Sequence, residues 1–163
     1  MHQLYNLYAH ALLNTAFRIV NNKEDAEDIL QESFIKAFTQ LHQFKYQSTF
    51  GAWIKRIVIN TSIDALKKKN STFFSTEING YTQAFDETSD RLEPLKRRQI
   101  NELYKALQDL PDGYRTVFSL YMLEGYDHQE IATILNIGVS SSISQLSRAK
   151  KKIRSLINKK ISI

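Results

Sequence analysis

Several features are missing from this 163-residue sequence, and each absence excludes a class of protein. The chain has no cysteine, which excludes disulfide bonds and metal sites built on thiolate ligands. No apolar run approaches the roughly 20 residues that span a bilayer, and the N-terminus lacks the charged and apolar regions of a signal peptide. We therefore expect a cytoplasmic protein without direct membrane insertion.

The usual signs of catalysis are missing as well. Four histidines are scattered along the chain without metal-ligand spacing, namely His2, His10, His42 and His128. The sequence contains neither a glycine-rich phosphate loop nor a nucleophile elbow. We therefore expect that the protein is not an enzyme, and that it has no catalytic residues, no metal site and no cofactor.

Charge is distributed unevenly along the chain. Residues 1–69 carry 9 basic and 6 acidic side chains, residues 70–93 carry 1 and 5, and residues 94–163 carry 12 and 6. Two basic blocks therefore flank an acidic one. Basic charge gathered on one stretch is typical of phosphate binding, although an ordinary solvated surface accounts for it equally well.

Helical periodicity dominates the first 69 residues, which contain three amphipathic patterns. The Asn21-Asn22 pair separates the first two helices, and we expect Ser48 to cap the third. Three such helices can enclose one core, with Phe34, Phe38 and Trp53 as its bulkiest members. The apolar positions are Leu4, Leu7, Tyr8, Ala11, Leu12, Thr15 and Ile19; Ala26, Ile29, Leu30, Phe34, Ala37, Phe38 and Leu41; and Trp53, Ile54, Ile57, Val58, Thr61 and Ala65.

The stretch 70–93 lacks sustained periodicity and is rich in Ser, Thr, Asn and acidic residues. This composition is typical of a flexible linker, although four aromatic side chains are unusual for a free coil. They leave open that the segment docks on a partner or on a domain. We therefore expect an all-α protein with two small helical domains, 1–69 and 94–163, joined by this linker.

The second domain contains the pattern of a helix-turn-helix. Asp127 and Glu130 have the spacing of a capping box, a short helix 131–135 follows, residues 136–138 form a tight turn, and a last helix begins near Ser140. We expect Ile131, Ala132, Leu135, Ile137, Ile143, Leu146 and Ile153 to pack inward.

The opposite face of the last helix carries polar and basic side chains at helical spacing: Ser141, Ser144, Gln145, Arg148 and Lys152. Amide, guanidinium and hydroxyl groups of this kind bond base edges and phosphates in DNA. A basic helix of this composition can also be merely solvated or lie on a membrane surface. The capping box and turn upstream favour the DNA interpretation.

Taken together, these motifs resemble the bacterial RNA polymerase sigma factors, in their two-domain extracytoplasmic-function (ECF) form. DAEDILQE and FGAWIKRIVINTSIDALKKK, within the first domain, resemble the family's segments for polymerase binding and for melting and reading the minus-ten element. LPDGYR, EGY, EIA and SRAKKK, in the second, resemble its minus-thirty-five-reading domain. The resemblance covers nearly the whole chain outside the linker.

The resemblance implies a role for each group of residues. Asp28, Gln31 and Glu32, with Asp25 beside them, would bind the clamp helices of the largest polymerase subunit, and the polymerase flap would be a further contact. Asn60 and Asp64, with Lys45, Gln47, Arg56 and Lys67, would hold the minus-ten element. The linker would enter the polymerase channels, an anti-sigma factor would be a further partner, and Ser141, Ser144, Gln145, Arg148 and Lys152 would read the minus-thirty-five element.

One stretch departs from the family pattern. Val139, Ser140 and Ile143 stand where an acid, a glycine and a basic residue are common in this family, and Ile143 removes an expected phosphate contact. A transcription regulator that uses the same helix-turn-helix without polymerase is the main alternative. Such a regulator would carry a sensor or dimerisation domain in place of the first 69 residues.

Overall fold

The computed structural model describes residues 2–69 and 93–161 of the chain. Over these residues every regular element is helical, which confirms the predicted all-α class. The chain divides into two compact units, Met1–Thr72 and Phe73–Ile163. The expected linker lies almost entirely outside the described residues.

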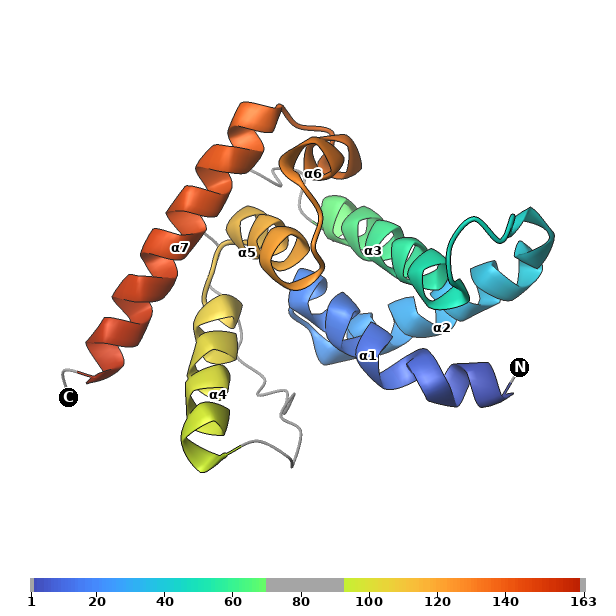
Figure 1. Cartoon of the computed structure of the whole chain (residues 1–163). Helices are drawn as coiled ribbons and strands as arrows, with labels where there is room; N and C mark the ends of the chain where they lie inside the picture. Colours follow the sequence, from blue (N-terminus) through green and yellow to red (C-terminus); the bar gives the residue numbers. More distant parts are fainter. Residues whose placement is uncertain (1, 70–92, 162–163) are drawn as a thin grey trace. The chain divides into compact units, whose positions relative to one another are not determined.

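The first unit is a three-helix bundle of α1 (His2–Val20), α2 (Lys23–Thr39) and α3 (Phe50–Lys69), with a short 3-10 turn η1 (Leu41–Gln43) after α2. Each of the three helices packs against the other two (Figure 1). The break between α1 and α2 is where the asparagine pair predicted it. Asn21 adopts a left-handed conformation (φ 54°), and the side chain of Asn22 accepts a hydrogen bond of 2.9 Å from the backbone N–H of Asp25.

The core of this unit agrees with the predicted periodicity except at its margins. Its buried apolar side chains include Leu12, Ile19, Ala26, Ile29, Leu30, Phe34, Ala37, Ile54, Val58 and Ile63. Leu7 is 70% exposed and Leu41 is also exposed, whereas Phe38 and Trp53 are only half-buried. The prediction of Ser48 as the helix cap is wrong, because Thr49 accepts the hydrogen bond from Ala52 N–H at 3.2 Å.

The second unit contains α4 (Pro94–Gln108), α5 (Asp112–Phe118), the π-helical turn η2 (Ser119–Leu123), α6 (His128–Leu135) and α7 (Val139–Ile161). Helix α7 packs against α4, α5 and α6. Gly125 adopts a positive φ of 79° just after η2, as expected for a glycine that ends a helix.

Arg115 is the largest side chain buried in this unit, at 2% exposed. Its guanidinium donates to the carbonyl of Leu110 at 3.0 Å and forms an ion pair with Asp112. Burial lowers the pKa of Arg115 below its usual value, and the Asp112 carboxylate opposes this effect. The LPDGYR motif therefore includes an ion pair between buried Arg115 and partly buried Asp112 at the start of α5.

Helices α6 and α7 form the predicted helix-turn-helix. The Asp127–Glu130 capping box is present in both directions, with hydrogen bonds of 2.8 and 2.9 Å. Asn136 takes the left-handed conformation (φ 55°) that ends α6. Across the turn, the His128 ring nitrogen Nδ1 lies 2.8 Å from the buried hydroxyl of Ser142, and this hydrogen bond ties the start of α6 to α7.

Candidate protein and nucleic-acid interfaces

The solvent side of α2 carries the acidic residues predicted from the sequence. Asp28, Gln31 and Glu32 are all exposed, opposite the buried side of the helix. Glu32 pairs within the helix with Lys36 at 2.6 Å. Asp25 lies at the margin, half-buried, and pairs with Lys69 of α3 at 3.0 Å.

Ile35 is part of this surface and was not singled out by the sequence reasoning. It is 67% exposed and lies three, four and seven residues after Glu32, Gln31 and Asp28, so it shares their side of α2. The sequence signal that could have identified Ile35 as exposed is its position outside the apolar stripe of this helix. We call Asp28, Gln31, Glu32 and Ile35 the acidic face.

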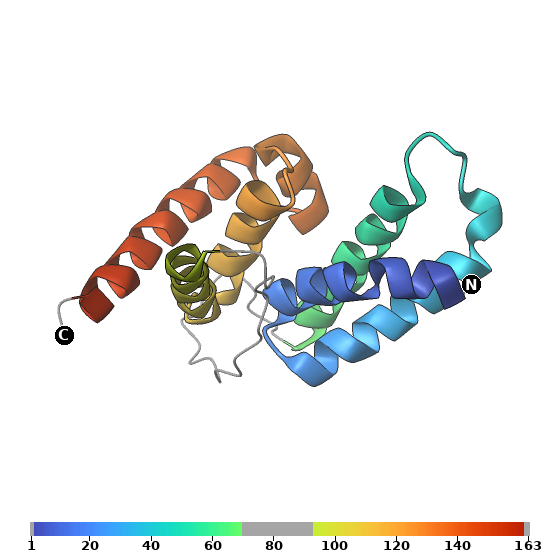
Figure 2. The ribbon, with the colours of Figure 1, turned by 60° about the horizontal axis from the view of Figure 1, so that its bottom comes forward.

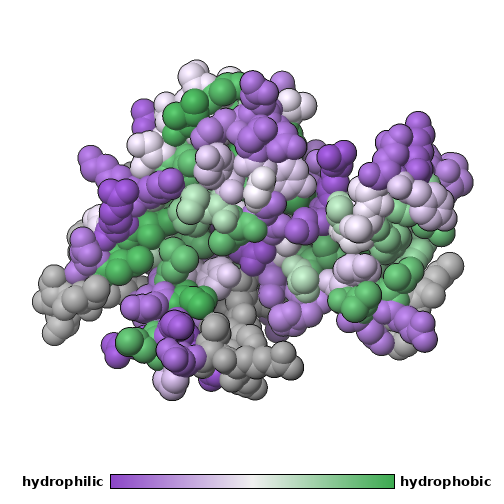
Figure 3. Space-filling model, in the orientation of Figure 1, coloured by the Kyte–Doolittle hydropathy of each residue, from purple (hydrophilic) through white to green (hydrophobic). Residues whose placement is uncertain are grey.

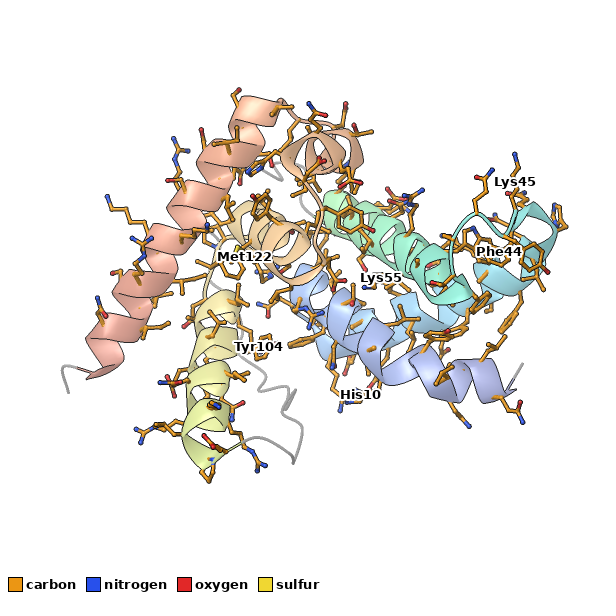
Figure 4. All side chains as sticks on the ribbon, viewed as in Figure 1. His10, Phe44, Lys45, Lys55, Tyr104 and Met122 are labelled. Atoms are coloured by element: carbon orange, nitrogen blue, oxygen red, sulfur yellow. The ribbon has the colours of Figure 1, made fainter. Side chains whose placement is uncertain are left out.

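Aromatic side chains cluster where the chain enters α3. The ring of Phe44 lies 4.7 Å from that of Tyr46, 5.2 Å from that of Trp53 and 6.2 Å from that of Phe50. The connection from η1 to α3 arches away from the bundle (Figure 2). Phe44 lies between this loop and α3, whereas Lys45 points away from the ribbon (Figure 4). The loop therefore exposes the cation of Lys45 next to a cluster of aromatic side chains.

Tyr46 is the most unusual residue of this loop. It is 86% exposed, and its φ of 55° is in the left-handed region, which a bulky side chain rarely adopts. Its neighbours Lys45 and Gln47 are exposed as well. An exposed ring beside a second ring, tilted by 52° to it, is the kind of surface on which unpaired bases stack.

The outer face of α3 continues from this cluster. Arg56, Asn60, Asp64 and Lys67 are all exposed and follow Trp53 at helical spacing, so they share one side of the helix. Half-buried Trp53 links them to the loop through its contact with Phe44. All six residues predicted for the minus-ten element are exposed, four along one side of α3 and two on the loop before it. We call these six residues, with Tyr46, the loop–α3 surface.

The side of α7 that faces solvent is rotated about the helix axis relative to the predicted side. Ser142, Leu146, Ala149 and Ile153 are buried and form the inward stripe. The prediction that Ile143 packs inward is wrong, because its side chain is 50% exposed. Ser141, Ser144, Arg148 and Lys152 are exposed as predicted, but Gln145 is half-buried at the edge of the inward stripe.

The physical reason is the polar residue at the inward position. Ser142 is fully buried because its hydroxyl bonds His128, and this contact orients the first turns of α7. Ile143, the next residue along the helix, is thereby turned toward solvent. We call the exposed side of α7, with Ser140, Ser141, Ile143, Ser144, Ser147, Arg148, Lys151 and Lys152, the recognition face.

No group of three or more His, Asp or Glu side chains in the described part of the chain has the geometry of a metal site. None of the described helices combines the length and the apolarity needed to cross a bilayer. The predicted residues therefore fall on three surfaces, one acidic and two that combine polar, basic and aromatic or apolar side chains.

Comparison with protein families matches both units. The model of sigma-70 region 2 matches residues 4–72, and the model of sigma-70 region 4 matches residues 100–153. The first match contains the acidic face and the loop–α3 surface, and the second contains the helix-turn-helix. Both matches agree with the resemblance read from the motifs.

Characterised relatives match along nearly the whole chain. The RNA polymerase sigma-H factor of Pseudomonas aeruginosa is 29% identical over 90% of this chain and 80% of its own length. The ECF RNA polymerase sigma factor SigW of Bacillus subtilis is 28% identical over 93% of this chain and 85% of its own.

Solved structures share the fold. The sigma factor RpoE of Bartonella quintana, in complex with the anti-sigma factor NepR, aligns with a TM-score of 0.64 at 21% identity over 96% of both chains. CnrH in complex with the cytosolic domain of CnrY aligns with a TM-score of 0.55 at 23% identity, over 96% of this chain and 86% of its own. The protein thus belongs to the sigma-70 family of RNA polymerase sigma factors, in its ECF group, and functions in promoter recognition and transcription initiation.

Proposed function

We propose that the acidic face of α2 is the surface that binds core RNA polymerase, on the clamp helices of its largest subunit. Asp28 and Glu32 supply charge for a basic partner, and complementary charge steers association and fixes register. Ile35 supplies an apolar contact in the middle of this charge, as binding surfaces commonly combine a buried apolar centre with a polar rim. Asp25, paired with Lys69, contributes at the margin.

The loop–α3 surface holds single-stranded DNA of the minus-ten element. Tyr46, backed by Phe44, offers a ring on which an unpaired base stacks. Asn60 and Asp64 bond base edges, and Lys45, Arg56 and Lys67 neutralise phosphates, with Gln47 as a further amide contact. The continuity of the exposed aromatic loop with this polar helix face is the observation that carries the proposal.

The recognition face of α7 binds the minus-thirty-five element as duplex. The N-terminal end of the second helix of a helix-turn-helix enters the major groove, which brings Ser141, Ser144 and Gln145 to base edges. Arg148 and Lys152 lie farther along the helix and contact phosphates. Residues 1–69 thus form the polymerase and minus-ten domain and residues 94–163 the minus-thirty-five domain, which also contacts the polymerase flap, with 70–93 as the linker.

The remaining assignments follow from this role. The protein acts as a non-catalytic subunit in the cytoplasm, where core polymerase and promoter DNA are found. An anti-sigma factor is a partner that masks the acidic face and the DNA-binding surfaces. Support for that partner comes from the RpoE and CnrH structures, which are complexes with the anti-sigma factor NepR and with the cytosolic domain of CnrY.

Run-off transcription with core polymerase on selected promoter fragments tests the proposal. The wild-type chain should give transcripts of defined start. Asn60→Ala should reduce promoter opening, measured by permanganate reactivity of unpaired thymines, without changing affinity for core polymerase. A template already unpaired at the minus-ten element should recover part of the lost activity.

Gln99→Ala is the matched control, because Gln99 is an exposed amide on α4, outside all three surfaces. It should leave opening unchanged. A chain that selects promoter DNA alone and never binds core polymerase would instead be a free-standing regulator, and the proposal would be wrong.

A further inference from the structure

The N-terminal end of α7 exposes two β-branched apolar side chains. Val139 and Ile143 are one helical turn apart and are 41% and 50% exposed. Hydrophobic atoms are visible at this end of α7 in the space-filling view (Figure 3). Isolated exposed apolar residues are common on protein surfaces. This pair points to a function only because it lies at the end of the helix that is proposed to enter the major groove.

Charge is absent from the same end of the helix. From Val139 to Ser147 the sequence of α7 contains no charged residue, and its cations begin at Arg148. The helix thus has an uncharged end rich in serine, followed by a cationic half. The cationic half suits phosphates, whereas the uncharged end can contact DNA only through serine hydroxyls, the Gln145 amide and apolar side chains.

The chemistry of the major groove restricts what an apolar side chain can contact there. Base edges present hydrogen-bond donors and acceptors, and the C5 methyl of thymine is the apolar group among them. An isoleucine pressed against a polar edge would remove water from groups that it cannot bond, at a cost in free energy. Contact with a thymine methyl avoids this cost and buries apolar surface on both sides.

We propose that Ile143, supported by Val139, selects thymine in the minus-thirty-five element through contact with the C5 methyl group. This rests on the proposed role of α7 as the recognition helix. Ile143 and Gln145 lie on opposite flanks of the recognition face, so they address different bases. The isoleucine in place of the family's usual cation then exchanges a phosphate contact for a base preference.

Uracil substitution tests the contact, because deoxyuridine differs from thymidine only by the C5 methyl. Holoenzyme made from the full chain and core polymerase is first used to select a promoter. Each thymine of the selected minus-thirty-five element is then replaced singly, and affinity is measured by competition. We expect one or two positions at which the wild-type holoenzyme loses about fourfold in affinity, the effect of one buried methyl group.

The variant Ile143→Ala should bind the thymine and uracil forms of those positions equally. Leu95→Ala is the matched control, since Leu95 is an exposed apolar residue of the same unit on α4, and it should keep the fourfold difference. Ile143→Arg should bind all sequences more tightly and lose the thymine preference.

Two results would overturn the role of Ile143 but leave the proposed role of α7 intact. One is a selected motif that is insensitive to uracil at every position, and the other is a thymine preference that persists in Ile143→Ala. A holoenzyme that selects no minus-thirty-five sequence would overturn the proposed role of α7 and this inference with it. The selection and the substitution therefore separate the two failures.

Discussion

The acidic face of α2 and the recognition face of α7 are both the solvent side of a helix whose other side is buried. Each has an exposed isoleucine, Ile35 in one and Ile143 in the other. They differ in charge, with Asp28 and Glu32 on α2 and a run of cations from Arg148 onward on α7. Amphipathic packing thus determines where each surface lies, whereas the sign of its charge determines whether a basic protein or a phosphate backbone can bind it.

The two faces also differ in how their charge is compensated. On α2, Glu32 pairs with Lys36 in the same helix, and Asp25 pairs with Lys69. Helix α7 contains no acidic residue, so nothing within it offsets its cations. We therefore expect salt to weaken the contacts of α7 strongly, because DNA binding releases counterions from phosphates.

The largest effect is expected from a change that destabilises the helices on which α7 packs. Arg115 of α5 is the residue whose removal should have this effect. Arg115→Ala removes a fully buried side chain together with its hydrogen bond to the Leu110 carbonyl and its ion pair with Asp112, and should destabilise the second unit by about 2–4 kcal/mol. Trp53 is the single tryptophan and lies in the first unit. Its fluorescence should therefore report an unchanged unfolding transition while circular dichroism detects early loss of helix.

The double variant Asp112→Leu with Arg115→Met is the control for this prediction. It removes both charges but keeps most of the buried side-chain volume of Arg115, so it should cost less than Arg115→Ala. An equal loss of stability in the two variants would mean that the polar contacts of Arg115, and not its buried volume, determine the effect.

Charge reversal on α2 is the next largest expected effect. Asp28→Lys combined with Glu32→Lys should weaken binding to core polymerase by roughly a hundredfold or more, since like charges would face each other. Titration of labelled protein with core polymerase measures the affinity, and a helical circular dichroism spectrum verifies the fold. Asp109→Lys, at an exposed acidic residue that ends α4 in the second unit, should have little effect, and equal effects of both changes would contradict the assigned face.

A smaller effect is expected on the cationic half of α7. Arg148→Ala should weaken holoenzyme binding to every promoter sequence to a similar degree. It should also reduce the slope of log affinity against log salt by about 0.9, the value for one lost phosphate contact. Arg98→Ala, an exposed cation on α4, should leave the slope unchanged. A change in the selected sequence would show that Arg148 reads a base.

The smallest effect should come from Gln145, which is half-buried. Gln145→Ala should relax the preference at one or two minus-thirty-five positions, with a loss of discrimination of about 1 kcal/mol, at the low end for an amide that bonds adenine. Promoter selection with the mutant holoenzyme measures this change. An unchanged motif would mean that Gln145 serves only the packing of α7.

Local signals in the sequence predicted the helices and most of their ends. Asn22 and Asp127 are caps because their side chains bond backbone N–H groups three residues away, and such short-range chemistry is visible in sequence. The interfaces on α2 and α3 followed from the same periodicity. In each case the residues that decide the structure are close together in the chain.

Contacts between distant residues were not predictable in this way. Hydropathy assigned Ile143 to the core of the helix-turn-helix, because nothing local indicates that Ser142 is buried against His128, 14 residues earlier. Arg115 appeared only as part of a family motif, although its role in the fold is a buried ion pair. Polar groups that are buried through specific partners therefore account for the main differences between prediction and structure.

At position 46, the residue that favours stability differs from the residue that favours the proposed function. Its left-handed backbone conformation is one that glycine adopts without steric penalty, so a screen of random variants for heat resistance should enrich Tyr46→Gly. On our proposal the same variant loses the ring that stacks on an unpaired base, so a screen for transcription should remove it. Two laboratory evolution experiments that start from this one sequence would therefore diverge at residue 46.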